Sequence, residues 1–95
     1  MITRIVRMTF KKELVPSFIS IFKENQDKIR DFNGCRYVHL YQDVANPYVF
    51  ITYSEWESME DLELYRQSDL FKTVWAKTKA CFDDKPIAFS MKKYL

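Results

Sequence analysis

His39 is the only histidine of the chain, and histidine is the side chain that ordinarily exchanges a proton near neutral pH. It lies in the stretch CRYVHLYQD, where Tyr37 and Tyr41 stand two residues to either side. If this stretch is a β-strand, the three side chains share one face. In a pocket, His39 would act as a base or a ligand. On an ordinary strand, it would form one hydrogen bond or face solvent. We keep His39 as a candidate catalytic residue with both interpretations open.

The sequence lacks the residue combinations that indicate most other kinds of site. Cys35 and Cys81 have no metal-ligand spacing and are expected to be reduced thiols. The acidic residues between Glu55 and Glu63 surround a predicted helix start, where the helix dipole accounts for them. Because Gly34 is the only glycine, a phosphate-binding loop is implausible. We expect no metal site, which leaves the aromatic side chains, 17% of the residues, as the main candidates for ligand contact.

Two periodicities predict the elements that would position these residues. Alternation of side chains predicts four β-strands, at 2–10, 35–43, 48–56 and 87–94. Apolar residues at three- and four-residue steps predict two helical regions. The first begins at Glu13 and stops at Gly34, which suits a left-handed C-terminal cap. The second begins after the N-cap Ser58, breaks at Ser68-Asp69 and ends at Lys85-Pro86.

The resulting order, β-α-β-β-α-β, predicts an α+β, ferredoxin-like fold. Such a fold has a four-stranded antiparallel sheet with the helices on one face. The other sheet face would remain uncovered, and we expect it to carry apolar residues, namely Ile5, Val38, Leu40, Val49 and Ile51. An apolar, uncovered sheet face is a common dimerisation surface. We therefore predict a homodimer that forms through this face.

Length and charge narrow the class of protein further. Ninety-five residues suit one domain, covering 1–95. The net charge of +2 is spread over mixed acids and bases, which disfavours nucleic acid or an anionic membrane as a partner. No apolar run approaches the length needed to span a bilayer, about 20 residues. Together with the reduced thiols, this predicts a cytoplasmic protein.

Four short motifs, in this order and spacing, resemble those of a known family. They are Asn33-Gly34-Cys35, Asn46-Pro47-Tyr48, the run Glu55-Trp56-x-Ser58, and the helix break Ser68-Asp69-Leu70-Phe71-Lys72. Over Ile2 to Tyr94 the chain resembles the antibiotic biosynthesis monooxygenase domain of the dimeric α+β barrel superfamily. The resemblance implies a homodimer whose two sheets meet as a barrel, with a pocket between sheet and helices in each subunit.

The resemblance also implies a function. Known members oxidise polycyclic phenols or quinols with oxygen and no bound cofactor, which predicts a cofactor-independent monooxygenase acting on a small aromatic or quinol-type substrate. The alternative is a ligand-binding or structural homodimer without turnover. A related branch binds and degrades haem, and this third reading is the weakest. The haem-degrading members use an Asn, a Trp and a His ligand where this chain carries Val6, Tyr65 and Trp75, so neither the hydrogen-bond donor nor the iron ligand is preserved.

The resemblance places Tyr65 and Trp56 near the pocket. Tyr65 would donate a hydrogen bond to a phenolic or quinone oxygen, and Trp56 would stack on an aromatic ring or simply pack at the strand end. Trp75 lies on a helical stripe with Phe71, where core packing and pocket lining are both open. The expected site thus has Tyr65 and His39 as catalytic candidates and four substrate-binding candidates, namely Trp56, Trp75, Phe71 and Val6.

Overall fold

A computed structural model describes all residues, 1–95, and its elements follow the predicted order. Strand β1 (Ile2–Thr9) leads through a short 3-10 helix, η1 (Lys12–Leu14), into α1 (Val15–Arg30). The hairpin of β2 (Cys35–Gln42) and β3 (Val49–Trp56) follows. Two helices, α2 (Met59–Arg66) and α3 (Asp69–Lys79), then precede β4 (Ile87–Met91).

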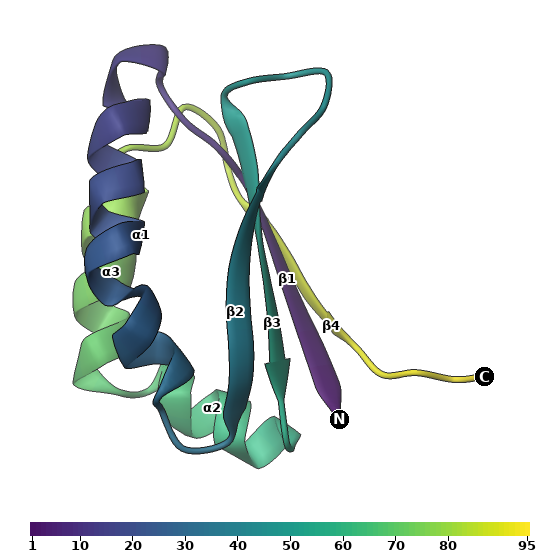
Figure 1. Ribbon diagram of the computed structural model, residues 1–95. Coiled ribbons are helices and arrows are strands. Elements are labelled where there is room, and N and C mark those ends of the chain that lie inside the picture. Colours follow the sequence, from purple (N-terminus) through teal and green to yellow (C-terminus); the bar gives the residue numbers. More distant parts are fainter.

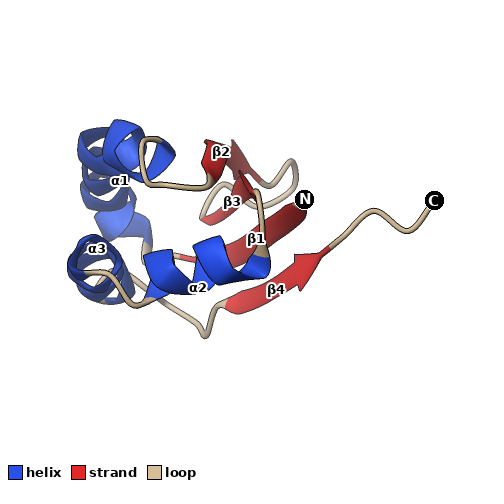
Figure 2. Cartoon of the chain, turned by 90° about the horizontal axis from the view of Figure 1, so that it is seen from below, coloured by secondary structure: helices blue, strands red, loops and turns tan.

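The four strands form one antiparallel sheet in the order β2-β3-β1-β4. Figure 1 shows α1 and α3 side by side on one face of this sheet, with α2 near the ends of β2 and β3. Seen from below, the helices form one layer and the strands another, and nothing lies over the far face of the sheet (Figure 2). The predicted ferredoxin-like α+β fold is confirmed.

The starts of α2 and α3 follow from local capping chemistry, as the sequence predicted. Ser58 is the N-cap of α2, and its side chain accepts a hydrogen bond from the Asp61 backbone N–H at 3.1 Å. Ser68 caps α3 in the same way, accepting from the Phe71 N–H at 3.1 Å. Gly34, expected to be the C-terminal cap of the first helix, is not that cap, because α1 ends at Arg30 and its C-cap is Asp31 in the right-handed conformation. Gly34 lies further along, just before β2, and its φ of +88° is a conformation that other residues adopt only with strain.

The last helical region and the last strand end earlier than predicted. Helix α3 ends at Lys79, so Cys81 and Phe82 follow the helix rather than continue its stripe. The chain turns there because Phe82 forms an isolated antiparallel bridge with Phe10, which draws the segment onto the end of the sheet. Strand β4 ends at Met91 rather than at 94, where its pairing with β1 stops.

The strand register corrects part of the predicted uncovered face. Val38 pairs with Ser54 and Leu40 with Thr52, and both Val38 and Leu40 pack against the core beneath the helices. An irregularity in pairing between Cys35 and Tyr37 turns Cys35 to the covered side as well. Because these residues have both polar and apolar neighbours in the sequence, the side-chain pattern did not show which face of the sheet they occupy. Ile5 and Ile51 lie on the uncovered face as predicted, because they alternate with residues of the covered face. Val49 shares their register but is 1% exposed, so it adds nothing to the uncovered surface.

The covered face packs its aromatic residues in two groups at opposite ends of the helix layer. Phe10 contacts Phe18, Phe50 and Phe82, with ring centroids 4.0 to 6.0 Å apart. The second group surrounds Tyr65, which contacts Phe32, Trp56 and Phe71 at centroid distances of 4.9 to 5.4 Å. The space between these groups is not filled, and it forms the cavity described below.

No helix of the chain combines the length and the apolar character that crossing a lipid bilayer requires.

Candidate functional site

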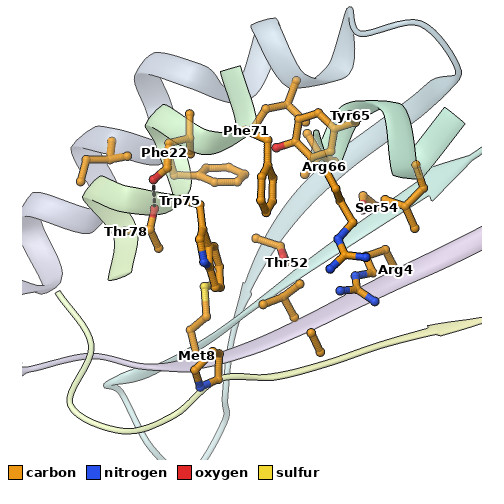
Figure 3. Close-up of a pocket in the computed structure, with 18 of the residues that line it drawn as sticks. Arg4, Met8, Phe22, Thr52, Ser54, Tyr65, Arg66, Phe71, Trp75 and Thr78 are labelled. Carbon is orange, nitrogen blue, oxygen red and sulfur yellow. Dashed lines mark hydrogen bonds between the residues drawn. The ribbon is translucent and has the colours of Figure 1, made fainter. Parts of the chain in front are cut away.

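A cavity of about 300 Å³ lies between the covered sheet face and the helices (Figure 3). Twenty residues line it, and 14 of them are hydrophobic, which is the composition of a typical small-molecule pocket. Strands β1 and β3 form its floor, with Val6 and Thr52 among the lining residues. Helices α1, α2 and α3 form its roof, contributing Phe22, Tyr65 and Trp75 among others.

The cavity is open to solvent beside β4. Arg66, at the end of α2, and Ala88, on β4, both line the cavity and are both exposed. Strand β4 is the outer strand of the sheet on this side, and the helix layer leaves its Ala88 uncovered. A ligand therefore has a route into the cavity between α2 and β4.

Two aromatic rings of α3 form one wall of the cavity. Phe71 and Trp75 stack nearly parallel, with centroids 5.8 Å apart and an interplanar angle of 12°. Both side chains are half-buried, and both point into the cavity in Figure 3. The Trp75 ring also meets the edge of Phe82 at 5.5 Å, which holds it in place. Such a wall suits a planar aromatic ligand.

Trp56 belongs to the fixed framework of the site. Its side chain is 0% exposed and stacks on Tyr65, with centroids 4.9 Å apart and an interplanar angle of 27°. Its indole N–H donates a hydrogen bond to the buried Ser54 hydroxyl at 3.0 Å. Because its ring has no exposed surface and its polar atom is already bonded, Trp56 supports Tyr65 from behind and presents no free face to the cavity.

Tyr65 is 9% exposed, and this burial, with a smaller contribution from Cys35, raises the pKa of its phenol above the ordinary value. The phenol therefore remains protonated at neutral pH and can donate a hydrogen bond. Its hydroxyl has no hydrogen-bond partner within the protein, although no fully buried polar side-chain atom is left without one. The hydroxyl must keep some contact with solvent, so it is free to bond to a ligand.

Two arginines, Arg4 and Arg66, occupy one end of the cavity, and their guanidinium groups lie side by side (Figure 3). Arg4 comes from the covered face of β1, and its Nη1 donates to the Ser90 hydroxyl of β4 at 3.1 Å. Arg66 forms an ion pair with Glu63 one helical turn away, with Nη1 and Oε2 3.2 Å apart. Burial and the neighbouring Arg66 lower the pKa of Arg4, and Glu63 opposes this. This end of the cavity is therefore positively charged.

His39 does not line this cavity. It lies on the uncovered face, paired with Tyr53 of β3 and close to Tyr37, with ring centroids 5.0 Å apart. It also borders a shallow pocket at the β2 edge, between Lys23 of α1 and Tyr41. The structure thus brings Tyr65 together with the four predicted substrate-binding residues and places His39 apart from them.

The arginine pair was not among the candidate site residues taken from the sequence. Arg4 could have been recognised from the sequence, because it is the one charged residue on the strand face that it shares with Ile2, Val6 and Met8. Nothing in the sequence indicated a role for Arg66 in the site, since an arginine in the last turn of a short helix is usually solvated and stabilises the helix end.

Comparison with known proteins identifies the family. The family model described as antibiotic biosynthesis monooxygenase matches residues 1–77. The chain therefore belongs to the antibiotic biosynthesis monooxygenase family. A comparison with functionally curated proteins finds no match.

Solved structures share the fold. A conserved protein from Methanosarcina mazei Go1 is 24% identical, with a TM-score of 0.91 over 98% of this chain and 93% of that one. A structure described as antibiotic biosynthesis monooxygenase is 19% identical, with a TM-score of 0.92 over the whole of both chains. A protein from Mycobacterium tuberculosis is 14% identical, with a TM-score of 0.88 over 97% and 93%.

The side chains around the cavity fit haem poorly. Haem iron is usually held by histidine, cysteine, methionine or tyrosine. Of these types, only Met8 and Tyr65 line the cavity. Met8 is 2% exposed, and burial disfavours the deprotonated form of Tyr65 that would ligate iron. We derive no step that involves haem.

Proposed function

We propose that this protein is a cofactor-independent monooxygenase that oxidises a small, electron-rich aromatic substrate, such as a quinol or an anthrone, in the cavity beneath the helices. The observation that carries the proposal is an aromatic-walled cavity with hydrogen-bond donors and positive charge at its polar positions, in a chain of the monooxygenase family. At about 300 Å³, the cavity is at the small end of ligand pockets, which favours a compact planar substrate.

The cavity suits a substrate that reacts as its anion. A substrate ring would lie against the Phe71–Trp75 wall, and its oxygen would accept a hydrogen bond from the Tyr65 hydroxyl. The positive charge of Arg4 and Arg66 favours ionisation of the substrate in an otherwise apolar environment. The role of the protein is to hold the ring, stabilise its anion and limit the access of water.

The reaction would draw its electrons from the substrate. For an anthrone, the carbanion form transfers an electron to oxygen, and the carbon and oxygen then combine to give a hydroperoxide. Loss of water from that hydroperoxide leaves a carbonyl group. One CH₂ carbon and one O₂ thus become one C=O carbon and one water, and no external reductant is consumed.

A second candidate function is the binding of an aromatic anion without turnover. It is favoured by the absence of histidine, aspartate and glutamate among the cavity-lining residues, which leaves no ordinary general base there. His39, the catalytic candidate from the sequence, would need to act from outside this cavity. Under the first proposal, the substrate must ionise because the site lowers its pKa, rather than because a side chain removes its proton.

We further propose that the chain functions as a homodimer through the uncovered sheet face. Large apolar side chains on this face are substantially exposed, including Ile87 at 54% and Phe89 at 47%. Tyr41, on the opposite edge strand, is 54% exposed. A sheet face with several large, exposed apolar side chains is uncommon on a monomer and common at an interface.

Oxygen uptake with an anthrone and with several quinols tests the oxygenase proposal. We expect uptake that depends on the protein, and a drop in kcat/KM of about tenfold to a hundredfold in Tyr65→Phe, because the variant loses one donor to the developing anion. Tyr94→Phe is the matched control, since Tyr94 is 90% exposed and remote from the cavity. Tight binding of these compounds with no oxygen uptake would favour the second candidate.

A further inference from the structure

The two cavity arginines differ in how their charge is compensated. Arg66 has a carboxylate partner in Glu63. Arg4 forms its one side-chain hydrogen bond with the neutral hydroxyl of Ser90 and takes part in no ion pair, although it is only partly exposed. At this end of a mainly apolar cavity there are thus two guanidinium groups and one carboxylate, which pairs with Arg66 alone.

Like charges that share a partly buried site repel one another, and a bound anion removes that cost. A guanidinium group presents paired N–H donors in a plane that matches the two oxygens of a carboxylate. A carboxylate also carries its charge across the whole neutral pH range, whereas an ordinary phenol does not. The arginine pair thus suits a permanent anion as well as it suits an anion that forms only during the reaction.

The position of the pair within the cavity is consistent with such a role. In Figure 3, Arg4 and Arg66 lie at one end, near Ser54, and Trp75 and Met8 lie toward the other. Arg66 is exposed, so the charged part of a ligand can remain near solvent while its ring enters among the aromatic side chains. This separates an anchoring end of the cavity from an aromatic end.

From this geometry we propose that Arg4 and Arg66 form an anchor for a carboxylate carried by the aromatic ligand, which makes the ligand class an aromatic carboxylic acid. The inference rests on the proposed function only in taking the cavity to be a ligand site. It adds that the ligand bears a fixed negative group at a distance from its reacting carbon, and it holds for an oxygenase and for a binding protein.

The test compares binding of naphthoate and naphthamide, which have the same ring and differ in charge, followed through tryptophan fluorescence or calorimetry. We expect naphthoate to bind the wild-type protein roughly tenfold to a hundredfold more tightly, because charged hydrogen bonds contribute more than neutral ones. In Arg4→Met this preference should shrink to within about threefold, and added salt should weaken the binding of naphthoate but not of naphthamide. Equal affinity of the wild-type protein for the two compounds would overturn the anchor.

Two further variants separate the anchor from general positive charge. Arg36→Met is the matched control, because Arg36 pairs with Glu57 on the surface, outside the cavity, and its loss should leave the preference unchanged. Glu63→Gln removes the carboxylate that now occupies Arg66 and should tighten naphthoate binding severalfold. If Arg36→Met reduces the preference as much as Arg4→Met does, the anchor is wrong. Retention of naphthamide binding in Arg4→Met shows that the variant still folds.

Inorganic phosphate distinguishes a carboxylate anchor from a phosphate site. We expect phosphate to compete with naphthoate only weakly, because the neighbouring apolar cavity adds nothing to its binding. Strong competition by phosphate alone would count against an aromatic acid as the ligand.

The binding experiments also distinguish a failure of the anchor from a failure of the oxygenase proposal. If the protein prefers naphthoate but takes up no oxygen, the anchor is supported and the oxygenase proposal is wrong. If it turns over neutral quinols but no hydroxylated aromatic acid, the oxygenase proposal is supported and the anchor is wrong.

Discussion

The two faces of the sheet are built from alternate residues of the same strands, yet they make different surfaces. The covered face meets three helices, and its cavity keeps two arginines and a free phenol hydroxyl at polar positions. The uncovered face meets no helix and carries aliphatic residues together with tyrosines and His39, and Tyr37 contacts both His39 and Tyr53. Whether a polar side chain is available to a ligand in the cavity therefore depends on the sheet face that it occupies as well as on its residue type.

Two tyrosines show this difference directly. The pKa of Tyr65 is raised chiefly by burial beneath the helices. The pKa of Tyr37 is raised to about 12 chiefly by a hydrogen bond, because its hydroxyl donates to Glu55 at 2.9 Å. Tyr37 also lies parallel to Tyr53, with centroids 5.9 Å apart. Both tyrosines are neutral at physiological pH, but only Tyr65 has a hydroxyl without a protein partner, and only Tyr65 lines the cavity.

The largest effect is expected from removing the framework of the covered face. Trp56→Ala deletes a fully buried indole that stacks on Tyr65 and bonds to Ser54, so we expect the free energy of unfolding to fall by about 3–5 kcal/mol. Urea denaturation followed by circular dichroism measures this. The control Leu64→Ala removes a side chain that is 59% exposed and should change stability by less than about 1 kcal/mol. A loss below about 1 kcal/mol in Trp56→Ala would show that the face is less tightly packed than described.

The uncovered face is tested by placing a charge on it. In the proposed dimer, Phe89→Glu buries an unpaired carboxylate, so the dimer dissociation constant should rise by at least about a hundredfold. Analytical ultracentrifugation over a range of concentrations measures this. Val44→Glu adds the same charge at an exposed loop position and should leave the assembly unchanged. If wild-type and Phe89→Glu proteins sediment alike, the face is not the interface.

The smallest effect concerns the hydrogen bond between Tyr37 and Glu55. Its neutral phenol is stabilised by donating to the carboxylate, so Glu55→Gln should lower the pKa of Tyr37 from about 12 toward the ordinary 10.0. Ultraviolet titration of tyrosinate measures this, and Glu57→Gln, on the exposed Arg36 ion pair, is the control. An unchanged titration in Glu55→Gln would mean that the hydrogen bond is not the main cause.

The same shift sets the sign of a pH effect on stability. A raised pKa means that the folded chain holds the Tyr37 proton more tightly than the unfolded chain does. The protonated Tyr37 therefore stabilises the folded chain fully below about pH 10, and this contribution is lost as the pH rises from there through about 12. In Glu55→Gln, this alkaline loss of stability should become smaller.

Local chemistry allowed most of the fold to be predicted. Ser58 and Ser68 begin helices because their side chains accept backbone hydrogen bonds, and Gly34 marks the turn into β2 because its φ of +88° is open to glycine. These signals lie within a few residues of the feature they specify. The errors arose where a distant segment intervenes, as when the bridge between Phe82 and Phe10 ends the last helical region.

The site was predictable only in part. Tyr65 and Trp56 were reached through the family resemblance, Trp75 and Phe71 through their helical spacing, and all four line one cavity. Arg66 was missed because nothing in its local sequence separates it from a surface arginine. His39 had the strongest chemical signal of any single residue, but that signal carries no information about which sheet face the residue occupies.

The sequence by itself determined the elements, the N-caps of α2 and α3, the order of the elements and the family, because each of these follows from residue types at short spacing. The tertiary structure alone decided the strand register, which moved Val38 and Leu40 beneath the helices, and the meeting of Arg4 with Arg66 across the cavity. Register and cavity shape depend on the packing of segments far apart in the chain. A one-residue change of pairing turns every side chain of a strand to the other face, so alternation alone leaves the face undecided.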